Sequence, residues 1–154
     1  MQQEQFEYVG FWTRFGATLV DTILILLITS PLVTAIYGTD YWISGGMVMG
    51  WMDFLISWVF PFVAVILFWH LKQATPGKMA MRARVVSAKT GQAPSLGQCI
   101  GRYFAYILST LPLGLGFIWV AIDDRKQGWH DKLAGTLVVR VPSRYAADTQ
   151  APTT

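Results

Sequence analysis

The sequence predicts an all-α integral membrane protein with two transmembrane helices, a third hydrophobic helix or hairpin broken by proline and glycine, and a small cytoplasmic two-stranded β element. The composition is the first reason: of 154 residues, 53% are hydrophobic and 14% are charged, which falls outside the range of soluble globular domains. The second reason is three long apolar runs, and the third is two short β-branched segments outside those runs. The composition excludes a disordered chain, a nucleic-acid-coating protein and a collagen-like fibre.

The first apolar run covers residues 15–36, reads FGATLVDTILILLITSPLVTAI and contains one charge, Asp21. Such a run is long enough to cross the ~30 Å hydrocarbon core of a bilayer as a helix. The preceding leader MQQEQFE carries Glu4 and Glu7 in place of a basic segment, so it does not resemble a secretory signal peptide. We therefore expect a retained transmembrane helix.

The second run, residues 54–71, has no formal charge and contains Pro61 near its middle. Proline removes a backbone donor and leaves the carbonyl of Ser57 without its usual partner, which predicts a kink in a continuous span. The third run, residues 103–122, is punctuated by Pro112, Gly114 and Gly116. The run is long enough to span the membrane, but its helix-breaking residues also allow it to fold back.

Charge distribution predicts the topology. The loop between the first two runs contains no Lys or Arg, whereas the segment after the second run contains Lys72, Lys78, Arg82, Arg84 and Lys89. Basic loops remain on the cytoplasmic side, so we expect a multi-pass protein of the bacterial cytoplasmic (inner) membrane with a cytoplasmic N-terminus.

Two β-branched segments, residues 83–88 and 136–141, are each other's obvious pairing partner. Pairing requires both to lie on the same side of the membrane, which favours a third run that enters and leaves from the cytoplasm. A straight third span with an external tail is the alternative. The expected organisation is an N-terminal tail at 1–7, a membrane domain at 8–141 and a disordered tail at 142–154.

Ionisable residues near the apolar runs are the candidate functional groups. Arg14 and Asp21 are seven positions apart, so they lie on nearly the same helix face, separated by ~10 Å along the axis. We expect a third group between or beside them. A carboxylate at that depth costs about 2.5–3.5 kcal/mol on insertion scales. Asp21 is therefore either a proton- or cation-binding group or a static hydrogen-bonded knot to Thr18, Thr22 or another helix.

His130 and Asp131 follow the third run and are flanked by Trp129 and Leu133. These apolar neighbours indicate that the pair is held at the membrane interface, where Asp131 is a candidate partner for Arg14. No nucleophile can be assigned to His130, and no Gly-x-Ser-x-Gly elbow occurs, so we expect no enzymatic activity. The lone Cys99 and two histidines predict neither a structural metal site nor a cofactor.

Arg14, Asp21 and the Asp131 of Gly-Trp-His-Asp-Lys-Leu-Ala-Gly-Thr resemble the RDD family of membrane proteins, named for one arginine and two aspartates. The similarity runs from about Tyr8 to Val141, and Arg82 departs from it, standing where a small residue such as glycine is expected. The further positions that match the family's spacing are Thr75-Pro76-Gly77-Lys78, Arg84-Val85-Val86, Gly91, Ser95, Arg102, His130 and Thr136.

The resemblance implies a polytopic membrane domain, with cation/proton antiport or ligand transport suggested for some relatives and a scaffolding role for others. Two functions follow for this chain. In the first, an oligomer transports a small cation, a proton or a solute through Asp21, gated by Arg14 and Asp131. In the second, the chain is a non-transporting scaffold or interaction protein in which these three residues are structural. The expected surroundings are the lipid bilayer and, for transport, further copies of the chain, with no nucleic acid.

Overall fold

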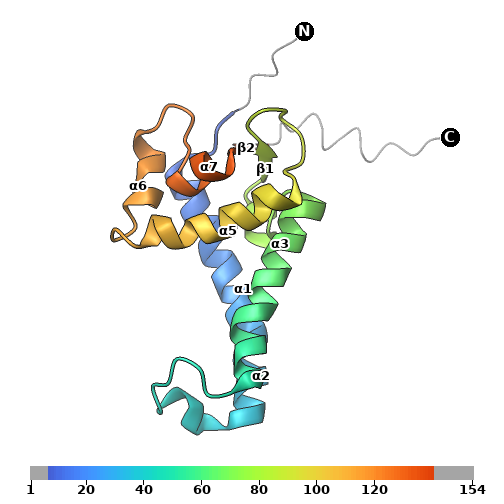
Figure 1. Cartoon of the computed structure of the whole chain (residues 1–154), viewed down its shortest axis with the longest axis vertical. Coiled ribbons are helices and arrows are strands. Elements are labelled where there is room, and N and C mark those ends of the chain that lie inside the picture. Colours follow the sequence, from blue (N-terminus) through green and yellow to red (C-terminus); the bar gives the residue numbers. More distant parts are fainter. Residues whose placement is uncertain (1–6, 141–154) are drawn as a thin grey trace, which may run out of the picture.

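Two long apolar helices form the stem of the molecule in the computed structural model, which describes residues 7–140 (Figure 1). The first is α1 (Phe11–Tyr37), and the second runs from Trp51 to Lys72 as α2 (Trp51–Phe54), η2 (Leu55–Val59) and α3 (Phe60–Lys72). Both are long and apolar enough to cross a membrane. The two predicted spans are confirmed, and each extends three or more residues further at its N-terminal end.

The kink predicted at Pro61 takes the form of a π-helical segment, η2, directly before the proline. Within it the Phe60 amide donates to the carbonyl of Leu55, one residue further back than in an α-helix. Proline cannot donate to the preceding turn, and a π-helical insertion accommodates the disturbed hydrogen-bond ladder without ending the helix. The second span therefore remains continuous.

The third apolar run is broken, as predicted, into α5 (Leu96–Thr110) and α6 (Leu115–Ile122), whose axes bend by 100°. Leu113 and Gly114 adopt positive φ at the corner, 53° and 78°. Beyond the corner, a Cβ on Gly116 would lie 2.7 Å from the Cα of Ser109, so only glycine permits this approach of the two helices. The run forms an L-shaped corner, with α5 lying across the end of the two spans (Figure 1).

Helix α5 begins seven residues before the apolar run because Ser95 caps it. The Ser95 hydroxyl accepts from the Gln98 amide at 3.2 Å, and the Gln98 side chain accepts from the Ser95 amide at 3.0 Å. This reciprocal capping box satisfies two donors that a helix start leaves free. The first two turns of α5 are amphipathic, so a search for apolar runs does not detect them.

The two predicted strands pair. β1 (Ala83–Ser87) and β2 (Thr136–Arg140) are antiparallel, with Ala83 opposite Arg140 and Ser87 opposite Thr136. The amide of Val9 also donates to the carbonyl of Val138 at 3.0 Å, so the segment before α1 joins the same strand. Because β2 contacts both β1 and this segment, the chain after α6 lies at the end of the spans from which it left.

The third apolar run thus begins and ends at the same end of the stem. This is the predicted geometry of a run that enters and leaves from one side of the membrane, and it differs from a straight third span. The segment is a corner and not a closed hairpin, since α5 crosses the end of the stem and α6 turns away from it (Figure 1). The predicted tail at 142–154, residue Val141 of the second strand and most of the tail at 1–7 lie outside the described residues.

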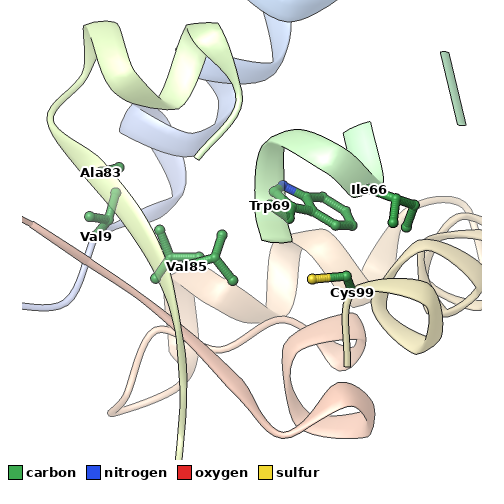
Figure 2. Packing of buried hydrophobic residues seen from close by; sticks show 7 residues of the cluster. Val9, Ile66, Trp69, Ala83, Val85 and Cys99 are labelled. Carbon is green, nitrogen blue, oxygen red and sulfur yellow. The ribbon is translucent and has the colours of Figure 1, made fainter. Parts of the chain in front are cut away.

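A buried core lies where the stem meets the sheet and α5. It consists of Val9, Ile66, Trp69, Ala83, Val85, Cys99 and Val138 (Figure 2). The stem itself is different: only 11% of the most apolar stretch of either span is buried within the chain. The remaining apolar side chains of the spans are available to contact lipid.

Candidate functional site

Asp131 is the centre of a buried cluster of charged residues at the sheet end of the stem. It lies in the first turn of α7 (Trp129–Ala134) and is fully buried. Its Oδ2 atom accepts from Nη1 of Arg14 and from the Gly128 amide at 3.0 Å. The predicted partnership of Arg14 with Asp131 is therefore confirmed, and it joins the first turn of α1 to the start of α7.

The remaining donors of Arg14 bind main-chain oxygens. Its Nε donates to the carbonyl of Val9 at 3.0 Å, and its Nη2 donates to the carbonyl of Lys126. A guanidinium whose three nitrogens each hold a different segment is a fixed structural group. Arg14 thus connects the N-terminal segment, α1 and the loop before α7.

Arg102 is a second cation on Asp131. It extends from α5, is 1% exposed, pairs with Oδ1 of Asp131, and donates from Nη1 to the Thr136 hydroxyl at 2.6 Å. Burial alone would raise the pKa of Asp131, but the guanidinium groups of Arg102 and Arg14 outweigh it and hold that pKa well below its usual range. The family resemblance indicated Arg102 and Thr136 as supporting residues, and the structure makes both of them part of the cluster.

His130 lies beside this cluster as a neutral aromatic group. Burial lowers the pKa of His130 to about 3, and its ring stacks on Tyr106 with 4.3 Å between centroids. Its Nδ1 is 3.4 Å from the hydroxyl of Ser109, a residue that the sequence did not single out. Serine, histidine and aspartate are adjacent here, but Ser109 is completely buried under Gly116. A substrate has no surface from which to reach its hydroxyl.

Asp21 contacts a different part of the molecule. Its carboxylate accepts from the Thr75 hydroxyl at 2.5 Å and from the Gly77 amide at 2.7 Å, at the start of α4 (Pro76–Ala80). The predicted knot to another helix is present, whereas Thr22 donates to the carbonyl of Thr18 instead. Among residues 7–140 Asp21 forms no ion pair.

The expectation that Arg14 and Asp21 share a neighbouring group is wrong. Arg14 lies against α7 and Asp21 lies against α4. Two turns of helix rotate side chains slightly and separate them by ~10 Å, which is enough to reach two different elements. Arg14 and Asp21 do lie on nearly the same face of α1, as predicted, but this one face packs against two different elements.

Gly77 explains how α4 comes so close to α1. A Cβ at this position would lie 2.9 Å from the carbonyl carbon of Ala17 and 2.9 Å from Cγ of Asp21. Lys78 follows it and is 6% exposed, with Nζ 5.9 Å from the centre of the Trp69 ring. The residues named by the family spacing therefore pack α4 onto the stem.

Asp53 was missed as a site residue, since the sequence suggested only a charge in the outer loop. It is fully buried at the other end of the stem. Its carboxylate accepts from Tyr41 at 2.9 Å, from Ser57 at 2.7 Å and from the Met49 amide at 2.9 Å. The available signal was Ser57 one turn later on the same helix face.

No group of three His, Cys, Asp or Glu residues in the described part of the chain could hold a metal ion.

These features define a polytopic integral membrane protein in which one arginine and two aspartates fix short membrane-proximal elements onto a two-helix stem. The RDD family profile matches residues 8–135. The chain belongs to the RDD family.

Its relatives include bacterial proteins that align over most of their length. The Bacillus subtilis "Uncharacterized protein YxaI" is 34% identical over 146 residues, covering 84% of this chain and 95% of the relative. The "Uncharacterized membrane protein YteJ" of the same organism is 32% identical, covering 86% of this chain and 80% of the relative. The Rickettsia prowazekii "Uncharacterized protein RP437" is 43% identical over 75 residues, 49% of this chain and 41% of the relative. No solved structure matches the chain.

Proposed function

We propose that this chain is a non-transporting, non-enzymatic membrane scaffold or interaction protein, in which Arg14, Asp21 and Asp131 are structural. The observation that carries the proposal is the complete burial of Asp131 between Arg14 and Arg102. A charge enclosed by two fixed guanidinium groups has no route for exchange with solvent and serves to hold α1, α5 and α7 together.

The contacts of Asp21 support the same role. Both carboxylate oxygens are occupied, one by the hydroxyl of Thr75 and one by the amide of Gly77. An acid that binds a neighbouring backbone in this way fixes the position of α4 on α1. The chain then presents its sheet, α4 and α7 as one rigid platform at the end of the stem, suited to contact another protein.

The proposed orientation places this platform in the cytoplasm, with the protein in the bacterial inner membrane. The platform and the chain segments next to it contain nine basic residues: Lys72, Lys78, Arg82, Arg84, Lys89, Arg125, Lys126, Lys132 and Arg140. The loop at the other end, residues 38–50, contains none. This asymmetry follows the positive-inside rule.

Transport through Asp21 is a second candidate function, and one observation favours it. The donors that contact Asp21 are neutral, so in the described part of the chain no cation compensates its charge. A carboxylate of this kind on a membrane span is suited to proton or cation exchange. Two spans and a corner cannot enclose a pathway, so this function requires a homo-oligomer.

Flux measurements separate the two functions. The full chain is reconstituted into vesicles that contain a pH-sensitive dye, and a sodium or potassium gradient is imposed. The scaffold proposal expects the same dye response as in protein-free vesicles. The control variant is Asp40→Asn, which changes an exposed acid at the far end of the stem. The scaffold proposal is overturned if the wild type shows a flux that Asp21→Asn loses and Asp40→Asn retains, with equal thermal stability and oligomeric state in all three proteins.

A further inference from the structure

Two cationic side chains approach the ring of Trp69 at the sheet end of α3. The ammonium of Lys78, from α4, is 5.9 Å from the centre of its ring, and the guanidinium carbon of Arg102, from α5, is 5.1 Å away. Trp69 and Arg102 are each 1% exposed, and Lys78 is 6% exposed. Two further elements therefore bring two cationic side chains close to one indole, whose own N–H is a third hydrogen-bond donor.

These donors lack acceptors. Within residues 7–140, Nε1 of Trp69 and Nε of Arg102 are buried without a hydrogen-bond partner, and Lys78 forms neither a hydrogen bond nor an ion pair. Figure 2 shows Nε1 of Trp69 on the edge of the ring that points away from the apolar side chain of Ile66. Buried donors in native proteins are nearly always satisfied.

The nearby carboxylates do not compensate Lys78. Asp131 is held between Arg14 and Arg102, and Asp21 is bound by Thr75 and Gly77. The indole face attracts a cation, but it cannot accept a hydrogen bond as an anionic oxygen does. The positive charge of Lys78 and two N–H donors, Nε1 of Trp69 and Nε of Arg102, are therefore left for an acceptor from outside the described chain.

We propose that Lys78, Nε of Arg102 and Nε1 of Trp69 form a binding site for an anionic phosphate oxygen. A lysine ammonium binds phosphate as a point charge, and an indole N–H is a typical donor at the membrane interface. The site lies at the end of a membrane span, and Lys78 is one of the nine basic residues of the platform and its neighbouring segments. Basic pockets at this level bind lipid headgroups. Lys78 keeps the largest exposure of the three residues, so the ligand enters on its side.

The phosphate can belong to an anionic lipid headgroup or to free inorganic phosphate, and one experiment separates these sources. The full chain is purified in detergent, and its thermal unfolding is measured with added phosphatidylglycerol, with zwitterionic phosphatidylcholine, or with inorganic phosphate against chloride at equal ionic strength. Native mass spectrometry counts the retained lipids. The variant is Lys78→Met, which keeps an unbranched stem over Trp69. The control is Lys72→Met, which removes an exposed charge at the end of α3.

The proposal expects phosphatidylglycerol to raise the melting temperature of the wild type and of Lys72→Met, but not of Lys78→Met, and to bind Lys78→Met at least tenfold more weakly. Without anionic ligand, Lys78→Met should be about as stable as the wild type, because Lys78 forms no hydrogen bond or ion pair within the described residues. A shift produced by inorganic phosphate that depends on Lys78 supports the site and assigns a soluble ligand.

Equal binding of phosphatidylglycerol to Lys78→Met and to the wild type would overturn the proposal, as would a wild type that no phosphate compound stabilises. If Lys78→Met does not fold, Trp69→Phe provides the test, since it keeps a six-membered aromatic ring and removes the indole donor. It should weaken lipid retention several-fold, and Lys78→Arg should preserve it. Unchanged retention in Trp69→Phe contradicts the proposed geometry.

Discussion

Arg14 and Asp131 form a buried ion pair across 117 positions of sequence. Arg14 stands in the first turn of α1, and Asp131 stands in α7, the last helix before β2. The pair therefore links the two ends of the described chain, beside the sheet in which Val9 and Val138 also meet.

Removing either member of this pair should be strongly destabilising. Loss of one partner of a buried pair leaves an uncompensated charge and typically costs about 3–5 kcal/mol. We expect Asp131→Ala, which leaves two guanidinium groups without their carboxylate, to lower the free energy of unfolding in detergent more than Arg14→Ala, which leaves Asp131 paired with Arg102. The double variant should cost less than the sum of the two. Reduced cellular abundance should accompany both single variants.

The exposed pair of Lys132 and Asp123 is the matched control, because 44% of the lysine side chain is accessible. Lys132→Ala should change stability by less than about 1 kcal/mol. Additive effects of Arg14→Ala and Asp131→Ala would contradict a coupled structural role.

Gly77→Ala should separate α4 from α1. The added Cβ would overlap the carbonyl oxygen of Ala17 and lie 2.9 Å from the carbonyl carbon of Ala17 and from the carboxyl carbon of Asp21, and the backbone of α1 cannot yield easily. Steric overpacking of this kind typically costs about 1–3 kcal/mol, and displacement of Asp21 from the Gly77 amide adds to it. We expect a lower melting temperature and earlier proteolytic cleavage between α3 and β1.

Gly101→Ala controls for the change in residue type. Gly101 lies within α5, and its Cβ would have no neighbour within 4 Å. Alanine is the better helix former by about 1 kcal/mol, so this variant should be neutral or slightly more stable. A Gly77→Ala protein as stable as Gly101→Ala would show that the close approach is not needed.

The sequence predicted the elements of the fold whose signals are local. Run length predicted both spans, the proline and glycine cluster predicted the break between α5 and α6, and β-branched segments predicted both strands. The pairing of Arg14 with Asp131 was also predictable, because both residues flank apolar segments on the same side of the membrane. For the spans, the break and the strands, a single segment carries the information, whereas the Arg14–Asp131 pairing also required the predicted topology.

Contacts that depend on packing were not predictable in the same way. The neighbour of Asp21 depends on how closely α4 approaches α1, and that distance is set by Gly77 together with the path of the chain after α3. The role of Asp53 depends on the loop that brings Tyr41 back over it. Arg82 illustrates a third case: its φ of 52° explains why glycine is expected there, but the backbone angle is visible only in the structure.

Asp53→Ala should loosen the end of the stem opposite the sheet. It would leave the Tyr41 and Ser57 hydroxyls and the Met49 amide without their shared acceptor. Each buried donor left unsatisfied costs about 1–3 kcal/mol, less where water reaches it. We expect faster hydrogen exchange in residues 38–54 and a lower melting temperature, with little change in the sheet. Asp40→Ala, at an exposed position of the same loop, should leave both measurements unchanged.

His130 should make the protein less stable as the pH falls below neutrality. Its pKa in the folded chain is about 3, because burial opposes protonation and Arg102, Arg14 and Lys78 repel a further positive charge, while Asp131 acts in the opposite direction. In the unfolded chain the imidazole titrates near its ordinary value of 6.5. The unfolded state therefore binds a proton that the folded state does not, between those two values. The full stability is present above pH 6.5 and is lost progressively as the pH falls towards 3.

The slope should be about 1.4 kcal/mol per pH unit below 6.5. The carboxyl of Asp131 does not add to it above about pH 4, because its pKa lies below the ordinary value in the folded state and its contribution is lost only at lower pH. His130→Phe keeps an aromatic ring against Tyr106 and cannot be protonated, so its stability should be nearly constant between pH 7.5 and 5, as measured by chemical unfolding in detergent. The exposed His70 provides the control, and His70→Gln should retain the slope of the wild type. A His130→Phe protein with an unchanged slope would mean that the imidazole is already accessible to protons in the folded state.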